Sequence, residues 1–72
     1  MVVTDQQIGA KIREMRHKRG IGQPELGEAL GVTFMMIQKY ETGASSITAV
    51  KLAKIAETLR CKTTDLLPKP SK

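Results

Sequence analysis

The chain has 72 residues, which is enough for one small domain but too few for a second hydrophobic core. Twelve Lys and Arg residues against seven Asp and Glu residues give a formal net charge of +5, a balance that favours polyanionic partners. The sequence has no apolar run long enough for a membrane span or a signal peptide, and its single cysteine, Cys61, excludes an internal disulfide framework. We therefore expect a soluble, cytoplasmic protein without a membrane partner.

The first part of the chain has the pattern of an amphipathic helix. Thr4 and Gln7 are spaced as a capping box, so this helix is expected to begin near Asp5. Gly20 is placed to end it, because glycine is common just past the last residue of a helix. The apolar residues that recur at helical spacing, and would face the core, are Ile8, Ile12 and Met15.

A second, shorter helix is predicted over residues 23–30. Pro24 falls in its first turn, where the missing N–H of proline is no loss. Leu26 and Leu30 are one helical step apart and so share a face. Gly31 follows directly and can adopt the left-handed conformation that ends a helix.

A third helix is predicted over residues 34–42, with Thr33 as its N-cap. Its inward face would carry Ile37 and Tyr40. Gly27, in the preceding helix, has only a hydrogen as its side chain, so the two helices can cross closely. A short helix, a glycine turn and another short helix in a basic chain are typical of the helix-turn-helix, which indicates DNA binding.

The remainder of the chain predicts one more helix, capped by Thr48, and a final turn around residues 64–67. The residues expected on the buried face of that helix are Ala49, Leu52, Ala53, Ala56 and Leu59. No strand pattern or repeat occurs. We expect an all-α domain of five short helices over residues 5–67, with a loose arm at residues 1–3 and a flexible tail at residues 68–72.

A set of residues spread from Ile8 to Leu67 matches the pattern of a known family. The matching residues are Ile12, Arg13, Arg16, Gly20, Ile21, Gln23, Glu25, Leu26, Gly27, Leu30, Gly31, Val32, Ile37, Tyr40, Glu41, Gly43, the stretch LAKIAETL, and Asp65, Leu66 and Leu67. In these residues the chain resembles the Xre/Cro–phage repressor (Cro/C1-type) helix-turn-helix family. The resemblance implies a compact five-helix lambda-repressor-like DNA-binding domain of prokaryotic or phage origin. It also implies a homodimer that binds an operator on double-stranded DNA to regulate transcription, so we expect a repressor that associates with the nucleoid when bound.

The chain departs from the family pattern at a few positions. Arg60 stands where a glycine usually follows the fourth helix, and Cys61 stands where valine is usual. Phe34, Met35 and Met36 fill the start of the third helix, where the family commonly carries polar or basic residues. We therefore expect the same fold but different details of base recognition.

Helical geometry selects the outward residues of the third helix. At about 100° per residue, the positions opposite its apolar face point to solvent, and a recognition helix places its N-terminal part against base edges in the major groove. The residues expected at the bases are Phe34, Met35, Gln38 and Lys39. Lys39 would donate to guanine, and Gln38 would pair with adenine or with phosphate. Phe34 and Met35 offer only apolar contact, which suits thymine C5-methyl groups. In the alternative interpretation, Phe34 and Met36 pack back against the second or fourth helix.

Phosphate contacts are expected where helices begin, because N–H groups and the positive end of the helix dipole suit an anion there. Gln23 opens the second helix, and Thr33 opens the third. The family resemblance also gives Gln23 a backbone contact. The residues that the resemblance adds after the third helix are Thr42, Gly43, Ser45 and Ser46. The two serines alternatively belong to an ordinary solvated loop.

Glu41 is expected near the inward side of the third helix, and the resemblance pairs it with Arg16 as a partly buried, structural ion pair. Breaking one side would leave an unpaired charge and cost roughly 3 kcal/mol or more if burial is deep. The other cations of the first helix are expected to form a solvated face: Lys11, Arg13, Lys18 and Arg19.

No pattern in the sequence indicates catalysis, a metal site or a cofactor, so we expect neither an enzyme nor a small-molecule effector. His17 has no companion ligand, and Cys61 is expected to pack as a small hydrophobe. The rival interpretation is a protein-binding module that uses an apolar patch of Phe34, Met35 and Met36. A third interpretation keeps DNA binding but makes the chain an antitoxin or a phage excision factor.

A homodimer is expected, because one recognition helix contacts few base pairs. Two copies related by a two-fold axis would place their third helices in successive major grooves, ~34 Å apart. The apolar residues that could form the interface are Ile47, Leu66 and Leu67, which alternatively belong to the core of the monomer.

Overall fold

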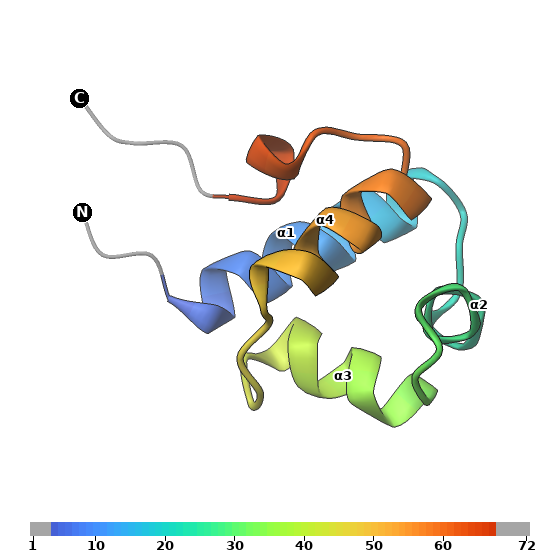
Figure 1. Cartoon of the computed structure of the whole chain (residues 1–72), viewed down its shortest axis with the longest axis horizontal. Coiled ribbons are helices and arrows are strands. Elements are labelled where there is room, and N and C mark those ends of the chain that lie inside the picture. Colours follow the sequence, from blue (N-terminus) through green and yellow to red (C-terminus); the bar gives the residue numbers. More distant parts are fainter. Residues whose placement is uncertain (1–3, 68–72) are drawn as a thin grey trace.

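The computed structural model describes residues 4–67, which form four α-helices and one 3-10 turn (Figure 1). In chain order these are α1 (Asp5–Lys18), α2 (Gln23–Leu30), α3 (Phe34–Thr42), α4 (Ala49–Thr58) and the 3-10 turn η1 (Thr63–Leu66). No strand occurs within these residues, so the prediction of an all-α fold is confirmed for this part of the chain. The arm and tail expected at residues 1–3 and 68–72 lie outside the described residues.

The prediction of five helices is wrong in one respect, because the last element is a single 3-10 turn. Lys62 N donates to Asp65 Oδ2 at 3.0 Å and so opens the turn. Leu67 is already extended, with φ −104° and ψ 145°. Pro68 comes next, and a residue that precedes proline disfavours the helical conformation. The turn therefore stops before an α-helix can form.

Threonine side chains fix the beginnings of three helices. At the start of α1, Gln7 N donates to Thr4 Oγ1 at 3.2 Å, and Thr4 N donates to Gln7 Oε1 at 3.0 Å, which completes the expected capping box. Thr33 and Thr48 accept hydrogen bonds from the backbone N–H groups of Met36 and Lys51, respectively. The boundaries of these helices are thus set by local sequence.

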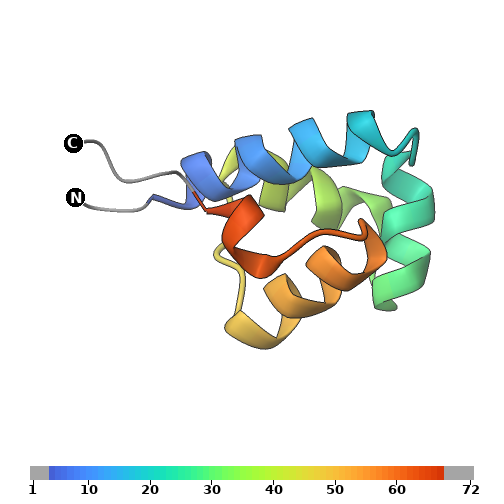
Figure 2. The same ribbon diagram turned by 90° about the horizontal axis from the view of Figure 1, so that it is seen from above.

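The helices surround one core. Seen from above, α1 and α4 lie on either side of η1, and α2 closes one end (Figure 2). α3 packs against both α1 and α2. The buried hydrophobic residues that meet in the core are Ile12, Leu26, Ile37, Tyr40, Leu52, Ile55, Ala56, Leu59 and Leu66. Every element contributes at least one of them, so the orientation of α3 depends on the whole domain.

The buried face of α4 differs in part from the expected one. Leu52 and Ala56 are buried as predicted, but Ala49 and Ala53 are exposed and Ile55 is fully buried. The helix is rotated so that Leu52 and Ile55 enter the core, because burying a larger apolar area is more favourable. The two small alanines therefore lie on the outside.

The three residues considered for a dimer interface have different environments. Leu66, on η1, is 0% exposed and packs in the core of the monomer. The expectation that it lies at an interface is therefore wrong. Ile47 and Leu67 are half-buried against the same core. Only these two retain accessible surface for a partner.

α1 and α3 approach each other so closely that position 9 has no room for a side chain. A Cβ atom on Gly9 would lie 2.2 Å from the carbonyl oxygen of Tyr40 and 2.6 Å from that of Glu41. This role of Gly9 was not predictable from the sequence, since a single glycine within a helix does not reveal what packs on it. Gly9 is what allows α3 to lie directly against α1.

Candidate nucleic-acid interface

The turn between α2 and α3 closes directly over Gly27. Gly31 ends α2 in the left-handed conformation, with φ 72° and ψ 28°, and Val32 N then donates to the carbonyl oxygen of Gly27 at 2.9 Å. A Cβ atom on Gly27 would lie 2.7 Å from the carbonyl oxygen of Val32. The close crossing that the sequence predicts is therefore present, and it fixes the angle at which α3 leaves α2.

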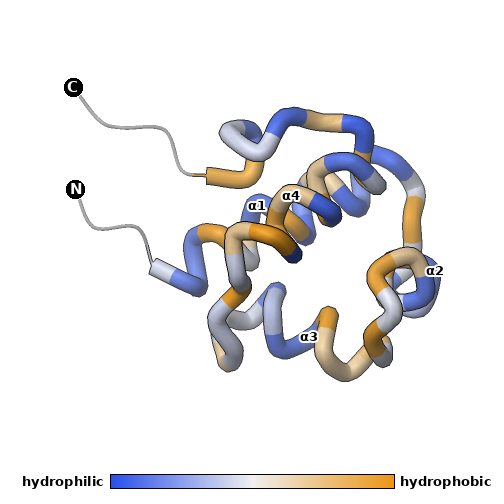
Figure 3. The backbone as a smooth tube through the Cα atoms, in the orientation of Figure 1, coloured by the Kyte–Doolittle hydropathy of each residue, from blue (hydrophilic) through white to orange (hydrophobic). Residues whose placement is uncertain are grey.

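The outward side of α3 carries four exposed side chains of two kinds. Phe34 and Met35 are 48% and 57% exposed, respectively. Gln38 and Lys39 are exposed further along the helix, while Ile37 faces the core with 0% exposure. Figure 3 shows the same division, with a hydrophobic first half of α3 and a hydrophilic second half. The helix thus presents an apolar end followed by a polar end.

Met36 belongs to the core rather than to this outward side. Its side chain is half-buried and packs against the core cluster, as the alternative interpretation expects. Phe34 does not do the same, because about half of its surface stays accessible. The apolar patch at the start of α3 therefore consists of Phe34 and Met35, not of three residues.

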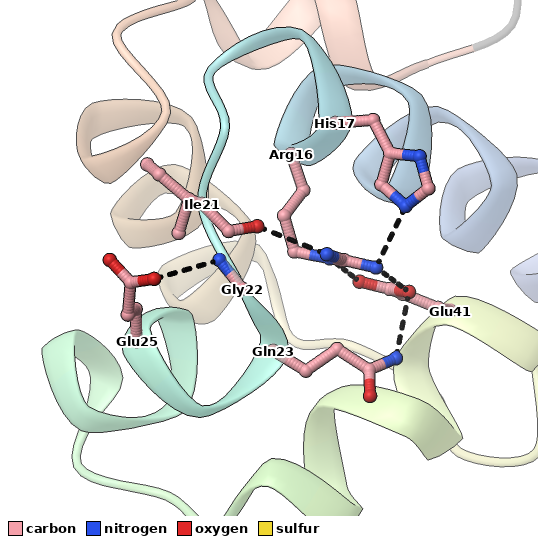
Figure 4. A network of polar contacts seen from close by, with 7 residues as sticks. All are labelled: Arg16, His17, Ile21, Gly22, Gln23, Glu25 and Glu41. Atoms are coloured by element: carbon pink, nitrogen blue, oxygen red, sulfur yellow. Dashed lines mark hydrogen bonds and ion pairs between the residues drawn. The ribbon is translucent and has the colours of Figure 1, made fainter.

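Three polar side chains from three helices meet beside α3 (Figure 4). Arg16 Nε donates to Glu41 Oε2 at 2.7 Å, and Arg16 Nη2 donates to Glu41 Oε1 at 3.1 Å. Gln23 Nε2 donates to the same Oε1 atom at 3.1 Å. Arg16 and Glu41 are each 8% exposed, so the ion pair implied by the family resemblance is present and buried. Two parallel hydrogen bonds fix the orientation of both groups as well as their distance.

The same network holds the loop that leads into α2. Arg16 Nη1 donates to the carbonyl oxygen of Ile21 at 3.0 Å, and Gly22 N donates to Glu25 Oε1 at 3.2 Å (Figure 4). His17 Nε2 lies 3.3 Å from Arg16 Nη2. The N-terminus of α2 is thereby placed at a fixed position relative to α3.

Three of the side chains expected at phosphates donate hydrogen bonds within the protein. Gln23 donates its amide nitrogen to Glu41, and in Figure 4 its amide oxygen points away from that carboxylate. The Thr42 hydroxyl donates to the carbonyl oxygen of Lys39 at 3.3 Å. The Ser46 hydroxyl donates to Asp5 Oδ2 at 2.7 Å, although the two residues are 41 positions apart. The position of the Asp5 carboxylate beside Ser46 was not predicted from the sequence.

The remaining residues of that set lie at helix ends and in the following loop. The Thr33 hydroxyl caps α3 by accepting from Met36 N at 3.4 Å. Gly43 ends α3 with φ 82°, and Ser45 N donates to the carbonyl oxygen of Lys39 at 3.2 Å. The loop after α3 is thus folded back onto the end of the helix rather than extended into solvent.

Arg13 lies beside this interface and was not assigned to it. A shallow depression of about 290 Å³ is lined by Arg13, Arg16, Gln23, Gln38, Glu41 and Thr42. Arg13 is exposed there, next to residues of α2 and α3. Its spacing from Arg16 could have indicated this position, since helical residues three positions apart are neighbours on one face.

Arg19 is exposed, as expected for the cations of the first helix, but its guanidinium also makes two hydrogen bonds within the protein. Its Nε donates to the carbonyl oxygen of Leu59 at 2.7 Å, and its Nη2 donates to the carbonyl oxygen of Arg60 at 3.2 Å. These carbonyl groups lie at the end of α4, where intrahelical donors are lacking and a cation is favoured by the helix dipole. Arg19 thus joins the end of α1 to the end of α4.

Cys61 is half-buried against the core, as a small hydrophobe would be. Burial raises the pKa of its thiol above the ordinary value, the Asp65 carboxylate acts in the same direction, and the Arg19 guanidinium opposes them. Among residues 4–67, no three His, Cys, Asp or Glu side chains gather as a metal site would need. The helices of this part of the chain are also too short and too polar to cross a membrane.

The sequence from residue 12 to residue 66 matches the family model described as helix-turn-helix. Together with the crossing of α2 and α3, this match shows that the chain belongs to the helix-turn-helix family of the Xre/Cro–phage repressor type. One curated relative is an uncharacterized HTH-type transcriptional regulator, y4wC, of Sinorhizobium fredii, which is 41% identical over 56 residues. The match covers 78% of this chain and 39% of that protein, so the chain spans about two fifths of the length of this relative.

Two solved structures of regulators are similar to the chain. The clp gene regulator ClgR of Corynebacterium glutamicum superposes with a TM-score of 0.84 at 26% identity, covering 86% of this chain and 66% of that one. The P22 c2 repressor, solved in complex with a synthetic operator, superposes with a TM-score of 0.76 at 30% identity. That likeness covers 83% of this chain and 91% of the repressor chain.

Proposed function

We propose that the chain is a sequence-specific, double-stranded DNA-binding transcriptional regulator that acts as a repressor. α3 would enter the major groove with the outward residues Phe34, Met35, Gln38 and Lys39 against the base edges. The observation that carries the proposal is the exposed outward side of α3, held by the buried pair of Arg16 and Glu41. Membership of a family that includes an operator-bound repressor supports it.

In this proposal the second half of α3 makes the polar base contacts. Lys39 would donate to O6 and N7 of guanine, and Gln38 would pair with N6 and N7 of adenine. Both side chains are exposed on a helix whose inward side is anchored by Ile37 in the core. Their bases would therefore be contacted by a rigid element, which favours specificity.

The DNA backbone would be held on both sides of α3. On one side are the starts of α2 and α3, with Gln23 and Thr33; on the other side is the segment after α3. That segment supplies Thr42, Gly43, Ser45 and Ser46. The Thr42 and Ser46 hydroxyls and the Gly43 and Ser45 N–H groups all donate within the protein, so a phosphate would share or replace those hydrogen bonds. We add Arg13, whose guanidinium borders the depression beside Gln23. Such contacts fix register rather than sequence.

A homodimer on a two-fold symmetric operator is part of the proposal. Ile47 and Leu67 are half-buried and keep some accessible surface, and Val50 on α4 is 69% exposed. Leu66 is left out because it is fully buried. Sedimentation of the purified protein with and without operator DNA would show whether two copies assemble. No cofactor or small-molecule effector enters the proposal.

Selection of DNA fragments by the purified protein tests this function. At about 150 mM salt, we expect enrichment of a two-fold symmetric site with half-sites one helical turn apart. Repeating the binding measurement at higher salt gives the slope of log K against log salt, which counts the phosphate contacts. Binding that is blind to sequence and disappears with salt would contradict the proposal.

A second candidate function is a protein-binding module that uses Phe34 and Met35. The exposure of these two side chains favours it, since exposed apolar patches often mark interaction sites. The exposed Lys39 and Gln38 on the same helix do not, because an apolar partner groove would leave their polar groups without partners. If DNA selection fails, Phe34→Ala and Met35→Ala variants would be compared in a search for a protein ligand.

A further inference from the structure

Phe34 and Met35 form an apolar end on a helix whose remaining outward residues are polar. They are the first and second residues of α3 and are 48% and 57% exposed. Among the described residues, the other strongly exposed large hydrophobic residue is Val50, on α4. Thr33 caps the first turn of α3, so the backbone that carries the pair is ordered. This end of the helix is therefore a fixed apolar surface.

Major-groove edges offer one apolar group, the C5-methyl of thymine. Methylation of cytosine at C5 places the same methyl group in the same groove. The two bases differ at the neighbouring ring position, where thymine has an O4 acceptor and cytosine has an N4 donor. Phe34 has no polar side-chain atom and Met35 has only a weakly accepting thioether, so this pair cannot tell O4 from N4.

On the basis of the proposed function, we propose that Phe34 and Met35 recognise the C5-methyl group itself. 5-Methylcytosine would then be accepted in place of thymine where the pair meets the DNA, and cytosine methylation there would strengthen binding. Gln38 lies four residues after Phe34, a little more than one helical turn or about 6 Å further along α3. Polar discrimination by Gln38 and Lys39 thus acts at other base pairs and leaves methyl recognition intact.

The size of the effect follows from burying one methyl group. Removing a methyl from a buried contact is expected to weaken binding about fourfold at each contacted position. Adding a methyl to cytosine at that position is expected to strengthen binding by a similar factor. The ratio of the affinities for thymine and uracil should equal the ratio of the affinities for 5-methylcytosine and cytosine, because the same apolar surface is buried in both cases.

The test uses the full chain and a duplex selected from a random library. Each thymine is replaced in turn by uracil, which deletes only the C5-methyl. Where uracil weakens binding, the base pair is changed to cytosine–guanine, with and without the C5-methyl. We expect uracil to bind about fourfold more weakly than thymine, and cytosine about fourfold more weakly than 5-methylcytosine.

Variants assign the effect to the two side chains. Phe34→Ala and Met35→Ala should bring both ratios towards one, whereas Gln38→Ala should leave them unchanged. Met35→Leu, which keeps an apolar side chain of similar size, should retain the ratios. Because Phe34, Met35 and Gln38 are exposed, these variants should keep the fold, and far-ultraviolet circular dichroism checks this.

The outcomes separate this inference from the function on which it rests. If a site is selected but no uracil substitution weakens binding, methyl recognition is wrong and DNA binding stands. The same conclusion holds if the ratios persist in both alanine variants. If no duplex is selected, the proposed function fails, and methyl recognition fails with it. The wild-type ratios alone can overturn the inference, so it does not depend on the variants binding well.

Discussion

Arg16 in α1 and Glu41 in α3 are joined by two hydrogen bonds in the interior, at 2.7 Å and 3.1 Å. Their side chains are 10% and 3% exposed, respectively. Charges this deep are tolerated only when their hydrogen-bonding capacity is used, and here Gln23 and the carbonyl oxygen of Ile21 complete the network. Within residues 4–67, no buried polar side-chain atom is left without a partner. The pair therefore sets the spacing between the helix that supports the interface and the helix that forms it.

Glu41→Ala is expected to lower the free energy of unfolding by about 3–5 kcal/mol, because it leaves the buried Arg16 guanidinium without its charged partner. Urea denaturation followed by circular dichroism measures this change. Glu28→Ala is the matched control: it removes a carboxylate from an exposed position of α2 and should shift stability by less than about 0.5 kcal/mol. Equal effects of the two substitutions would show that the ion pair does not stabilise the fold.

Lys39→Ala and Gln23→Ala should affect DNA binding in different ways. Lys39→Ala is expected to cost about 1–3 kcal/mol of binding and to relax the preference at one base pair, since it removes a base-edge donor. Gln23→Ala should weaken all sequences about equally, as a phosphate contact would. Gln23 also donates to Glu41, so the stability of this variant must be measured as well. An unchanged site preference and affinity for Lys39→Ala would contradict the role of α3.

Local patterns were sufficient to predict α2, α3 and the turn between them. Gly31, Thr33 and the apolar spacing of Leu26 and Leu30 act within a few residues, and the structure places α2 and α3 over residues 23–30 and 34–42, the expected ranges. The rotation of α4 was not predictable in the same way. The expected face included Ala49 and Ala53, and packing against the other helices buried Ile55 in their place.

Contacts between segments far apart in the chain could not be predicted from the sequence. Arg19 meets Leu59, 40 positions away, and Ser46 meets Asp5, 41 positions away. Both contacts involve exposed polar residues or backbone atoms, which carry no periodic pattern from which a partner could be inferred. The pairing of Arg16 with Glu41 was accessible only through the family resemblance, although the inward position of Glu41 was evident from helical spacing.

Arg60→Gly is expected to stabilise the fold by about 1 kcal/mol. Arg60 has φ 57°, a left-handed conformation that disfavours residues with a Cβ atom and suits glycine. The hydrogen bond from Arg19 to residue 60 uses the backbone carbonyl group, so it would be kept. Thermal unfolding compares this variant with Lys62→Gly, an exposed control at an extended backbone position, with φ −83° and ψ 151°. A destabilised Arg60→Gly protein would mean that the arginine side chain outweighs the backbone strain.

Gly27→Ala should destabilise the fold by more than about 2 kcal/mol, because it introduces a clash of the kind caused by overpacking. The added Cβ atom would lie 2.7 Å from the carbonyl oxygen of Val32, a backbone atom that cannot move without reopening the turn. Gly22→Ala is the control, since its Cβ atom would lie 3.4 Å from Glu25 Oε1, a flexible side-chain atom. We also expect Gly27→Ala to lose DNA binding in protein that remains folded, because α3 would be displaced. Retained affinity would show that the close crossing is not needed.

Cys61 should react slowly with iodoacetamide in the folded protein. Alkylation proceeds through the thiolate, and burial raises the pKa of this thiol above its ordinary value of 9.0. At each pH between about 7 and 10, the rate should be lower than for the urea-unfolded chain. Because the folded-state pKa is raised, the neutral thiol contributes stability below the unfolded pKa, and this contribution is lost as pH rises through the folded value. Asp65→Asn, which keeps an acceptor oxygen for Lys62 N, should accelerate the reaction by removing the second cause of the shift. A folded-state rate equal to that of the unfolded chain would mean that the thiol is not shielded in solution.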